Sequence, residues 1–249
     1  MTQWVFDLGN SRVKCAPLQA DGTLGPMLAF AYDDALLAAL DAEVPATVAR
    51  EASTAVLASV ASPERTATVV DWLTTRFGTV SIARTQAALA GVRIAYAEPV
   101  RMGVDRFLAL LAARRRGAGA WLVVGVGTAV TVDLLDAQGR HHGGRIAPSP
   151  RLMRDALHAA AAQLPAQGGD YVEFATDTAD ALASGCEGAA LGLIERSLEQ
   201  ACETLGQRPA LLLHGGGAPA LAAQLREGEM APGLVLEGLA VWARLGTDA

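Results

Sequence analysis

The feature that most constrains the fold is a glycine-centred turn that occurs twice, once in each half of the chain. The stretch Val5 to Asn10 matches Val123 to Thr128 in register, and an apolar run precedes the glycine in both copies. Each turn leads into a second apolar run that is typical of a strand. Because self-similarity at this scale indicates an internal duplication, we predict two related domains at 1–117 and 118–249.

Periodicity and turn signals give both halves a similar α/β element order. The first half is expected to contain strands at 4–8, 13–18, 24–32, 55–60 and 79–83, and helices at 33–40, 63–77 and 103–116. The second half is expected to contain strands at 121–126, 129–135, 141–146, 210–214 and 234–236, and helices near 151–163, 178–205 and 219–226, with a last helix to 245. A three-stranded meander therefore opens each half.

The first turn carries side chains that suit a phosphate site. Gly9 lets backbone N–H groups approach phosphate oxygens, while Asn10 and Ser11 add short donors. Lys14 supplies a positive charge, and Asp7 can hold a hydrated magnesium ion. Taken alone, these residues also fit an ordinary surface hairpin, since Gly-Asn turns are common in hairpins of every function.

Composition excludes several classes of protein. A net charge of −6 and a pI near 5.2 argue against nucleic-acid binding. No apolar run reaches the ~20 residues of a membrane span, and charged residues within the first fourteen positions argue against a secretory signal, so we expect a cytoplasmic protein. Three widely spaced cysteines fit neither a disulfide framework nor a zinc site, and we expect buried free thiols.

Two helix starts could also contribute to a site. The stretch Gly103 to Arg106 opens a helix whose N-terminus favours an anion, although Asp105 could simply complement the helix dipole. Thr178 opens a long helix as an N-cap by residue type, and its hydroxyl could instead contact a ligand. In the second turn, Thr128 could donate to phosphate or merely suit a strand.

Four motifs, in order and with matching spacing, resemble those of the type III pantothenate kinase family. They are Asp-x-Gly-Asn-Ser-x-x-Lys at 7–14, Gly-x-Asp-Arg at 103–106, Gly-Thr-Ala-x-Thr-x-Asp at 127–133 and Gly-Gly-x-Ile-x-Pro at 143–148. The doubled element order resembles the duplicated ribonuclease-H-like fold of the sugar kinase, Hsp70 and actin superfamily. That resemblance implies two actin-like ATPase domains with a nucleotide cleft between them.

The family resemblance implies ATP-dependent phosphorylation of pantothenate to 4′-phosphopantothenate, the first step of coenzyme A biosynthesis, by a homodimer. Asp105 would be the general base, and Asp7 would hold Mg²⁺ through water. The ATP site would comprise Asp7, Leu8, Gly9, Asn10, Ser11, Arg12, Val13, Lys14 and Thr128. The pantothenate site would comprise Tyr96, Gly103, Val104, Asp105, Arg106 and Thr178.

The sequence departs from the family at one position. Members carry an aspartate two residues before the Gly-Thr-Ala motif, where it helps to bind an activating K⁺ or NH₄⁺, whereas this chain has Gly125. We therefore expect weak or absent K⁺ dependence, because a hard oxygen ligand is missing. The alternatives are a non-catalytic accessory regulator of the same fold, which would bind nucleotide or a protein partner, and a kinase of another small alcohol.

Overall fold

The structure is a computed structural model that describes residues 2–44 and 52–245. The chain divides into two compact units. Unit 1 comprises the residues up to 118, residues 138–140 and the residues from Gly233 onward, whereas unit 2 comprises residues 119–137 and 141–232. Residues 233–245 therefore belong to unit 1, although they follow unit 2 in the sequence.

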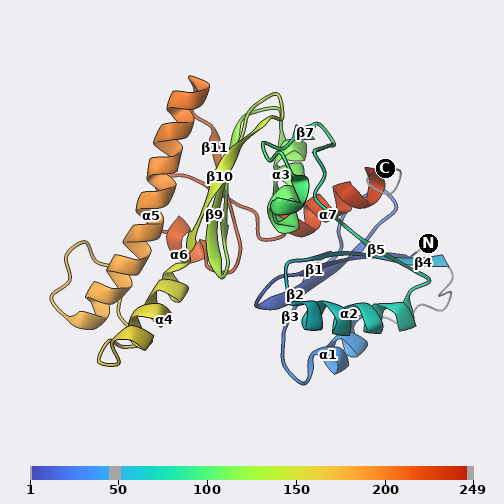
Figure 1. The fold of residues 1–249 in the computed structure, drawn as a ribbon, viewed down its shortest axis with the longest axis horizontal. Coiled ribbons are helices and arrows are strands. Elements are labelled where there is room, and N and C mark those ends of the chain that lie inside the picture. Colours follow the sequence, from blue (N-terminus) through green and yellow to red (C-terminus); the bar gives the residue numbers. More distant parts are fainter. Residues whose placement is uncertain (1, 45–51, 246–249) are drawn as a thin grey trace. The chain divides into compact units, whose positions relative to one another are not determined.

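Unit 1 is built on a five-stranded sheet, within its described residues, with the strand order β3-β2-β1-β4-β5 (Figure 1). Its strands are β1 (Thr2–Leu8), β2 (Arg12–Leu18), β3 (Leu28–Ala31), β4 (Ser53–Ser59) and β5 (Thr79–Ile82), and a small ribbon follows at β6 (Ala88–Leu89) and β7 (Val92–Arg93). The first three strands form an antiparallel meander, while β4 and β5 run parallel to β1.

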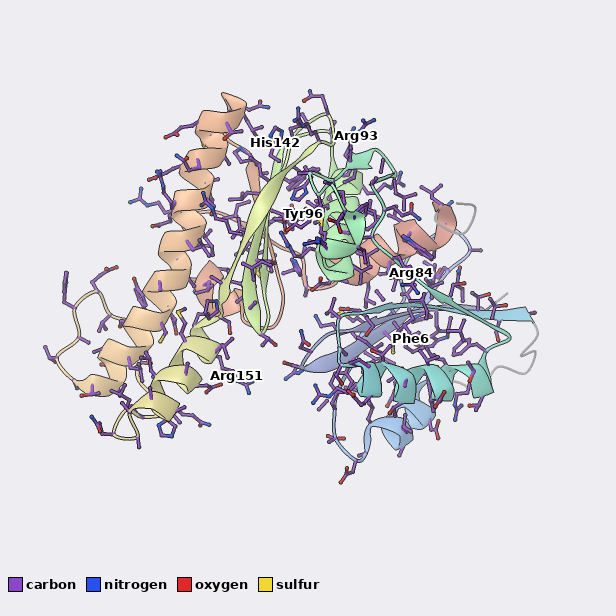
Figure 2. The ribbon with its side chains drawn as sticks, viewed as in Figure 1. Phe6, Arg84, Arg93, Tyr96, His142 and Arg151 are labelled. Carbon is purple, nitrogen blue, oxygen red and sulfur yellow. The ribbon has the colours of Figure 1, made fainter. Side chains whose placement is uncertain are left out.

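Helices cover both faces of this sheet. They are α1 (Leu36–Glu43), α2 (Pro63–Arg76), α3 (Val104–Arg116) and α7 (Leu234–Leu245), and a short 3-10 helix, η2 (Pro99–Arg101), precedes α3. Phe6 and Leu8 of β1 point into the core with Trp72 and Leu73 of α2, as Figure 2 shows for Phe6. Because side chains alternate along a strand, Asp7 faces the opposite side, where α3 and α7 pack.

Unit 2 has a sheet with the order β10-β9-β8-β11-β12, and its strand directions repeat those of unit 1. Its strands are β8 (Trp121–Val126), β9 (Ala129–Leu135), β10 (His141–Pro148), β11 (Ala210–His214) and β12 (Glu229–Met230). Its helices are α4 (Pro150–Ala160), α5 (Thr178–Leu205) and α6 (Ala218–Ala222), and α5 and α6 cover the apolar face of the sheet. The shared topology confirms the predicted duplication.

Two parts of the predicted element order are wrong. The expected strand at 234–236 is the first turn of α7, and the fifth strand of unit 2 is instead β12 at Glu229–Met230. Three apolar residues in a row are too few to show whether the spacing is that of a strand or of a buried helix. In α7 the buried residues Leu234, Leu236 and Leu239 point in different directions around the helix, so no single apolar stripe marks it as a helix. The third strand of unit 1 is also shorter than predicted, because Gly25 and Pro26 precede it.

Two smaller expectations can be compared with the structure. Cys15 and Cys186 are buried free thiols, as predicted, whereas Cys202 is only partly buried. Across the ranges 2–44 and 52–245, no helix combines the length and the apolarity that crossing a membrane requires.

Candidate active site

The first glycine turn is the tight connection between β1 and β2, as the sequence predicts. The Gly9 N–H donates to the Arg12 carbonyl oxygen at 3.1 Å and closes the turn. Asp7 and Lys14 lie directly opposite each other on the two strands. Cross-strand neighbours have Cβ atoms about 5 Å apart, so the carboxylate and the ammonium group belong to one local cluster. Asn10, Ser11 and Arg12 at the tip are exposed.

Asp7 is a buried carboxylic acid in a sheet core, with 9% of its surface exposed. Burial raises its pKa from the ordinary 3.8 to about 7; the Lys14 ammonium opposes that rise and the charge of Asp105 adds to it. Loss of hydration disfavours the ionised form, and a second carboxylate nearby disfavours it further. A cation beside Asp7 would relieve both effects, which suits a metal-binding role.

The N-terminus of α3 presents the Gly-x-Asp-Arg motif on the same face of the sheet as Asp7. The Asp105 Oδ1 atom accepts a hydrogen bond from the Arg106 N–H at 2.8 Å. A Cβ atom on Gly103 would lie 2.6 Å from this Oδ1, so the glycine leaves room for the carboxylate. The electrostatic effect of Asp105 on Asp7 shows that the two carboxylates lie within range of each other.

Arg106 is charged yet buried, with 6% of its surface exposed. Its Nη1 donates to the Tyr96 hydroxyl at 3.1 Å, and its Cζ lies 5.8 Å from the centroid of the Tyr96 ring. Figure 2 shows Tyr96 beside α3. A guanidinium group held in this way is oriented before a ligand arrives, and it offers a planar fork of donors to a carboxylate or another polar group.

The second glycine turn connects β8 and β9 in unit 2. The Gly127 N–H donates to the Ala129 carbonyl oxygen at 2.9 Å, and the exposed Thr128 accepts a backbone hydrogen bond from Ser149. Gly125 occupies the place in β8 that Asp7 occupies in β1. A Cβ atom there would lie 2.7 Å from the Thr131 Oγ1 atom and 2.9 Å from the His214 Nε2 atom, so a side chain at this position would require Thr131 and His214 to move.

Thr178 is not the N-cap of α5, contrary to the expectation from its residue type. The cap is Asp177, whose Oδ1 accepts from the N–H groups of Ala179 at 2.9 Å and Asp180 at 3.1 Å. Thr178 is instead the first helical residue, and it is exposed. The sequence could have suggested Asp177, because aspartate and threonine are both good N-caps. Which of the two caps the helix depends on whether the helix begins at residue 178 or 179.

The structure therefore brings Asp7, Lys14, Asp105, Arg106 and Tyr96 together in unit 1, while Thr128 and Thr178 belong to unit 2.

Sequence reasoning missed two residues of unit 1. Tyr32 follows β3 and Arg65 lies in the first turn of α2, and both approach the first glycine turn. Neither belongs to a recognisable motif, so only the packing of α2 against the sheet reveals them.

Comparison with known proteins gives a consistent result. A family model for type III pantothenate kinase matches residues 4–200. A type III pantothenate kinase of Stenotrophomonas maltophilia (strain K279a) is 58% identical over 243 residues, which are 98% of each chain.

Solved structures show the fold. A protein from Campylobacter jejuni that is described as a Baf family transcriptional activator has a TM-score of 0.63 and 16% identity, covering 99% of this chain and 100% of that one. A protein from Sinorhizobium meliloti described as a 2-dehydro-3-deoxygalactonokinase has a TM-score of 0.59 and 16% identity, with coverage of 97% and 99%. These similarities confirm the predicted sugar-kinase and actin-like ATPase fold.

Proposed function

This chain belongs to the type III pantothenate kinase family, and from that premise we propose how its residues carry out the reaction. The reaction is the ATP-dependent phosphorylation of pantothenate to 4′-phosphopantothenate, the first step of coenzyme A biosynthesis. The observation that supports the residue roles is the grouping of Asp7, Lys14 and Asp105 on one face of the unit 1 sheet. Release of ADP from ATP in the presence of pantothenate tests the activity.

Asp105 is the general base in this proposal. Transfer of a phosphoryl group to a primary hydroxyl needs a carboxylate that accepts the hydroxyl proton while the oxygen attacks in line. The Arg106 N–H holds Asp105 in a defined orientation at the start of α3. Replacing Asp105 with Asn should lower kcat while nucleotide binding survives, and unchanged turnover would remove Asp105 from this role.

The first glycine turn binds the phosphates of ATP. Backbone N–H groups at the tip of the turn and the Lys14 ammonium compensate the phosphate charge, while the Gly9 N–H closes the turn and the remaining residues from Asp7 to Val13 shape it. The donor set fits Mg²⁺, because Asp7 is a buried oxygen ligand whose ionised form gains from a neighbouring cation. Asp7 would hold this ion, and Mg²⁺ would supply positive charge against the negative charge that develops during phosphoryl transfer. Thr128 of the second glycine turn is proposed as a further nucleotide contact.

Pantothenate binds at the start of α3. Arg106 is held by Tyr96 and can pair with the pantothenate carboxylate, and the backbone at Gly103 and Val104 allows the substrate to approach Asp105. Thr178 adds a hydroxyl from the first turn of α5, where Asp177 already provides the cap. A higher KM for pantothenate, with little change for ATP, is the expected result of altering Arg106.

The reaction of this chain should depend little on a monovalent cation. Gly125 supplies no carboxylate, and the side chains of Thr131 and His214 lie next to the position that a side chain at residue 125 would occupy. A threonine hydroxyl and an imidazole do not replace the negative charge of a carboxylate, and its absence disfavours K⁺. Rates measured in K⁺ and in Na⁺ at equal ionic strength test this point, and strong activation by K⁺ would contradict it.

A homodimer is proposed through the exposed apolar face of α4 and α5. None of the described residues of α4 is buried, and Leu152 and Leu157 are 40% and 44% exposed. A cavity of about 500 Å³ opens between the two helices and is lined almost entirely by apolar side chains, including Met153, Ala156 and Leu182. Apolar surface of this kind on a helix pair favours a symmetric contact with a second copy. Sedimentation analysis measures the state directly.

A further inference from the structure

We propose that Arg65, supported by Tyr32, is a positioning residue that fixes the Asn10–Ser11 peptide of the first glycine turn for binding of nucleotide phosphate. The inference rests on the proposed function, because it assigns a means of holding the phosphate-binding turn in one conformation. Neither residue belongs to any of the motifs that identify the family, and 55 positions separate Arg65 from Asn10.

Two contacts hold the Arg65 side chain against the turn. Its Nη1 donates to the Asn10 carbonyl oxygen at 2.7 Å. Its Cζ lies 4.5 Å from the centroid of the Tyr32 ring, which is a cation–π distance. A guanidinium group is planar, so stacking on one face and a hydrogen bond at one edge together remove most of its freedom. The exposed Arg65 side chain thereby links α2 to the turn.

The first turn of α2, which carries Arg65, is also held in place by hydrogen bonds. The Ser62 hydroxyl caps α2 by accepting from the Arg65 N–H, and the Val60 N–H donates to the Leu8 carbonyl oxygen at 3.0 Å. Hydroxyl groups of Ser59 and Thr66 lie 2.7 Å apart and join the end of β4 to the first turn of α2. These hydrogen bonds connect the start of α2 to the end of β1, which is where the glycine turn begins.

The hydrogen bond to Asn10 has a defined effect on the turn. In a planar trans peptide the carbonyl and the following N–H point in opposite directions. Because Arg65 draws the Asn10 carbonyl toward α2, the Ser11 N–H is directed away from α2. Loss of Arg65 would let this peptide rotate and would misdirect the N–H. A phosphate cradle built from backbone N–H groups depends on such orientation.

The electrostatic environment is consistent with this placement. Burial raises the pKa of Tyr32 to about 12; the charge of Asp7 raises it further and the charge of Arg65 lowers it. The Tyr32 hydroxyl is therefore influenced by the charges of both Asp7 and Arg65, and Arg65 places a positive charge beside the first glycine turn. A positive charge held there favours an approaching phosphate and does not need to touch it.

The test compares Arg65→Ala and Arg65→Lys with a matched control, Arg76→Ala. Arg76 is in the last turn of the same helix, where it stacks on Trp72 at 5.0 Å and pairs with Asp41, away from the glycine turn. For each variant, ADP release gives KM for ATP and for pantothenate separately. Calorimetry gives the Kd of a non-hydrolysable ATP analogue, and thermal unfolding verifies that the variants fold.

Arg65→Ala should raise both KM for ATP and the analogue Kd about tenfold, with less than about a twofold change in KM for pantothenate. Arg65→Lys should recover part of the loss, since it restores a donor, and Arg76→Ala should leave both constants unchanged. Unchanged ATP constants in Arg65→Ala, or equal changes in the two arginine variants, would overturn the inference. A wild-type protein that binds the analogue but does not phosphorylate pantothenate would refute the proposed function, whereas the Kd comparison would still decide the role of Arg65.

Discussion

Replacing Asp7 with Asn should stabilise the free protein while it abolishes activity. The carboxyl group has a pKa of about 7 in the folded chain against an ordinary 3.8, chiefly because it is buried. At about 1.4 kcal/mol for each pH unit, this difference corresponds to about 4 kcal/mol when the group is fully ionised. The asparagine side chain has nearly the same shape and no charge, so the variant escapes this cost.

The direction in which stability changes with pH follows from the proton that Asp7 binds in the folded chain. Between pH 4 and pH 7 the folded protein holds a proton on Asp7 that the unfolded chain has released, so the stability of the wild type falls as the pH rises. The stability of Asp7→Asn lacks this contribution. The difference between the two proteins should therefore grow from pH 5 to pH 7 by up to about 3 kcal/mol and level off above pH 7.

Urea unfolding at intervals of half a pH unit, without nucleotide or divalent metal, measures this difference. The exposed Asp34→Asn variant is the control for loss of a negative charge, and its curve should stay parallel to that of the wild type. Mg²⁺ with an ATP analogue should narrow the gap, because ligand binding stabilises only the wild type. A gap that is constant from pH 5 to pH 8 would refute the argument that burial holds Asp7 protonated.

Four further outcomes follow from the geometry. Asp105→Asn should lower kcat by ~10²-fold or more with the nucleotide Kd unchanged, as single-turnover kinetics and calorimetry would show. Arg106→Lys should raise KM for pantothenate about tenfold, since lysine cannot reproduce a planar fork; an equal rise in KM for ATP would argue against a substrate role. Gly125→Ala should destabilise the protein by about 1–3 kcal/mol in urea unfolding, because its Cβ would contact neighbouring side chains below 3.0 Å. Leu157→Glu should shift the protein toward monomer in sedimentation, and an unchanged dimer would place the interface elsewhere.

The sequence was sufficient for the repeated turn, the two sheets and the residues that the motifs carry. Asp7 and Lys14 could be placed opposite each other because a tight hairpin fixes the register of its strands. Two kinds of feature escaped prediction. The contact of Arg65 with Asn10 depends on how α2 packs, which no local pattern encodes. The pKa of Asp7 depends on burial under the helices that pack on its face of the sheet, which composition does not reveal.

Helix α7 makes the order of synthesis matter for unit 1. The helix covers the face of the unit 1 sheet that carries Asp7, and it buries Leu234, Leu236 and Leu239. The ribosome synthesises these residues after all of unit 2. The apolar surface that α7 covers in the earlier part of unit 1 is therefore exposed until synthesis of unit 2 is complete. Unit 1 is thus completed last, and a transcript cut short near its end yields a chain with every motif but an unfinished core.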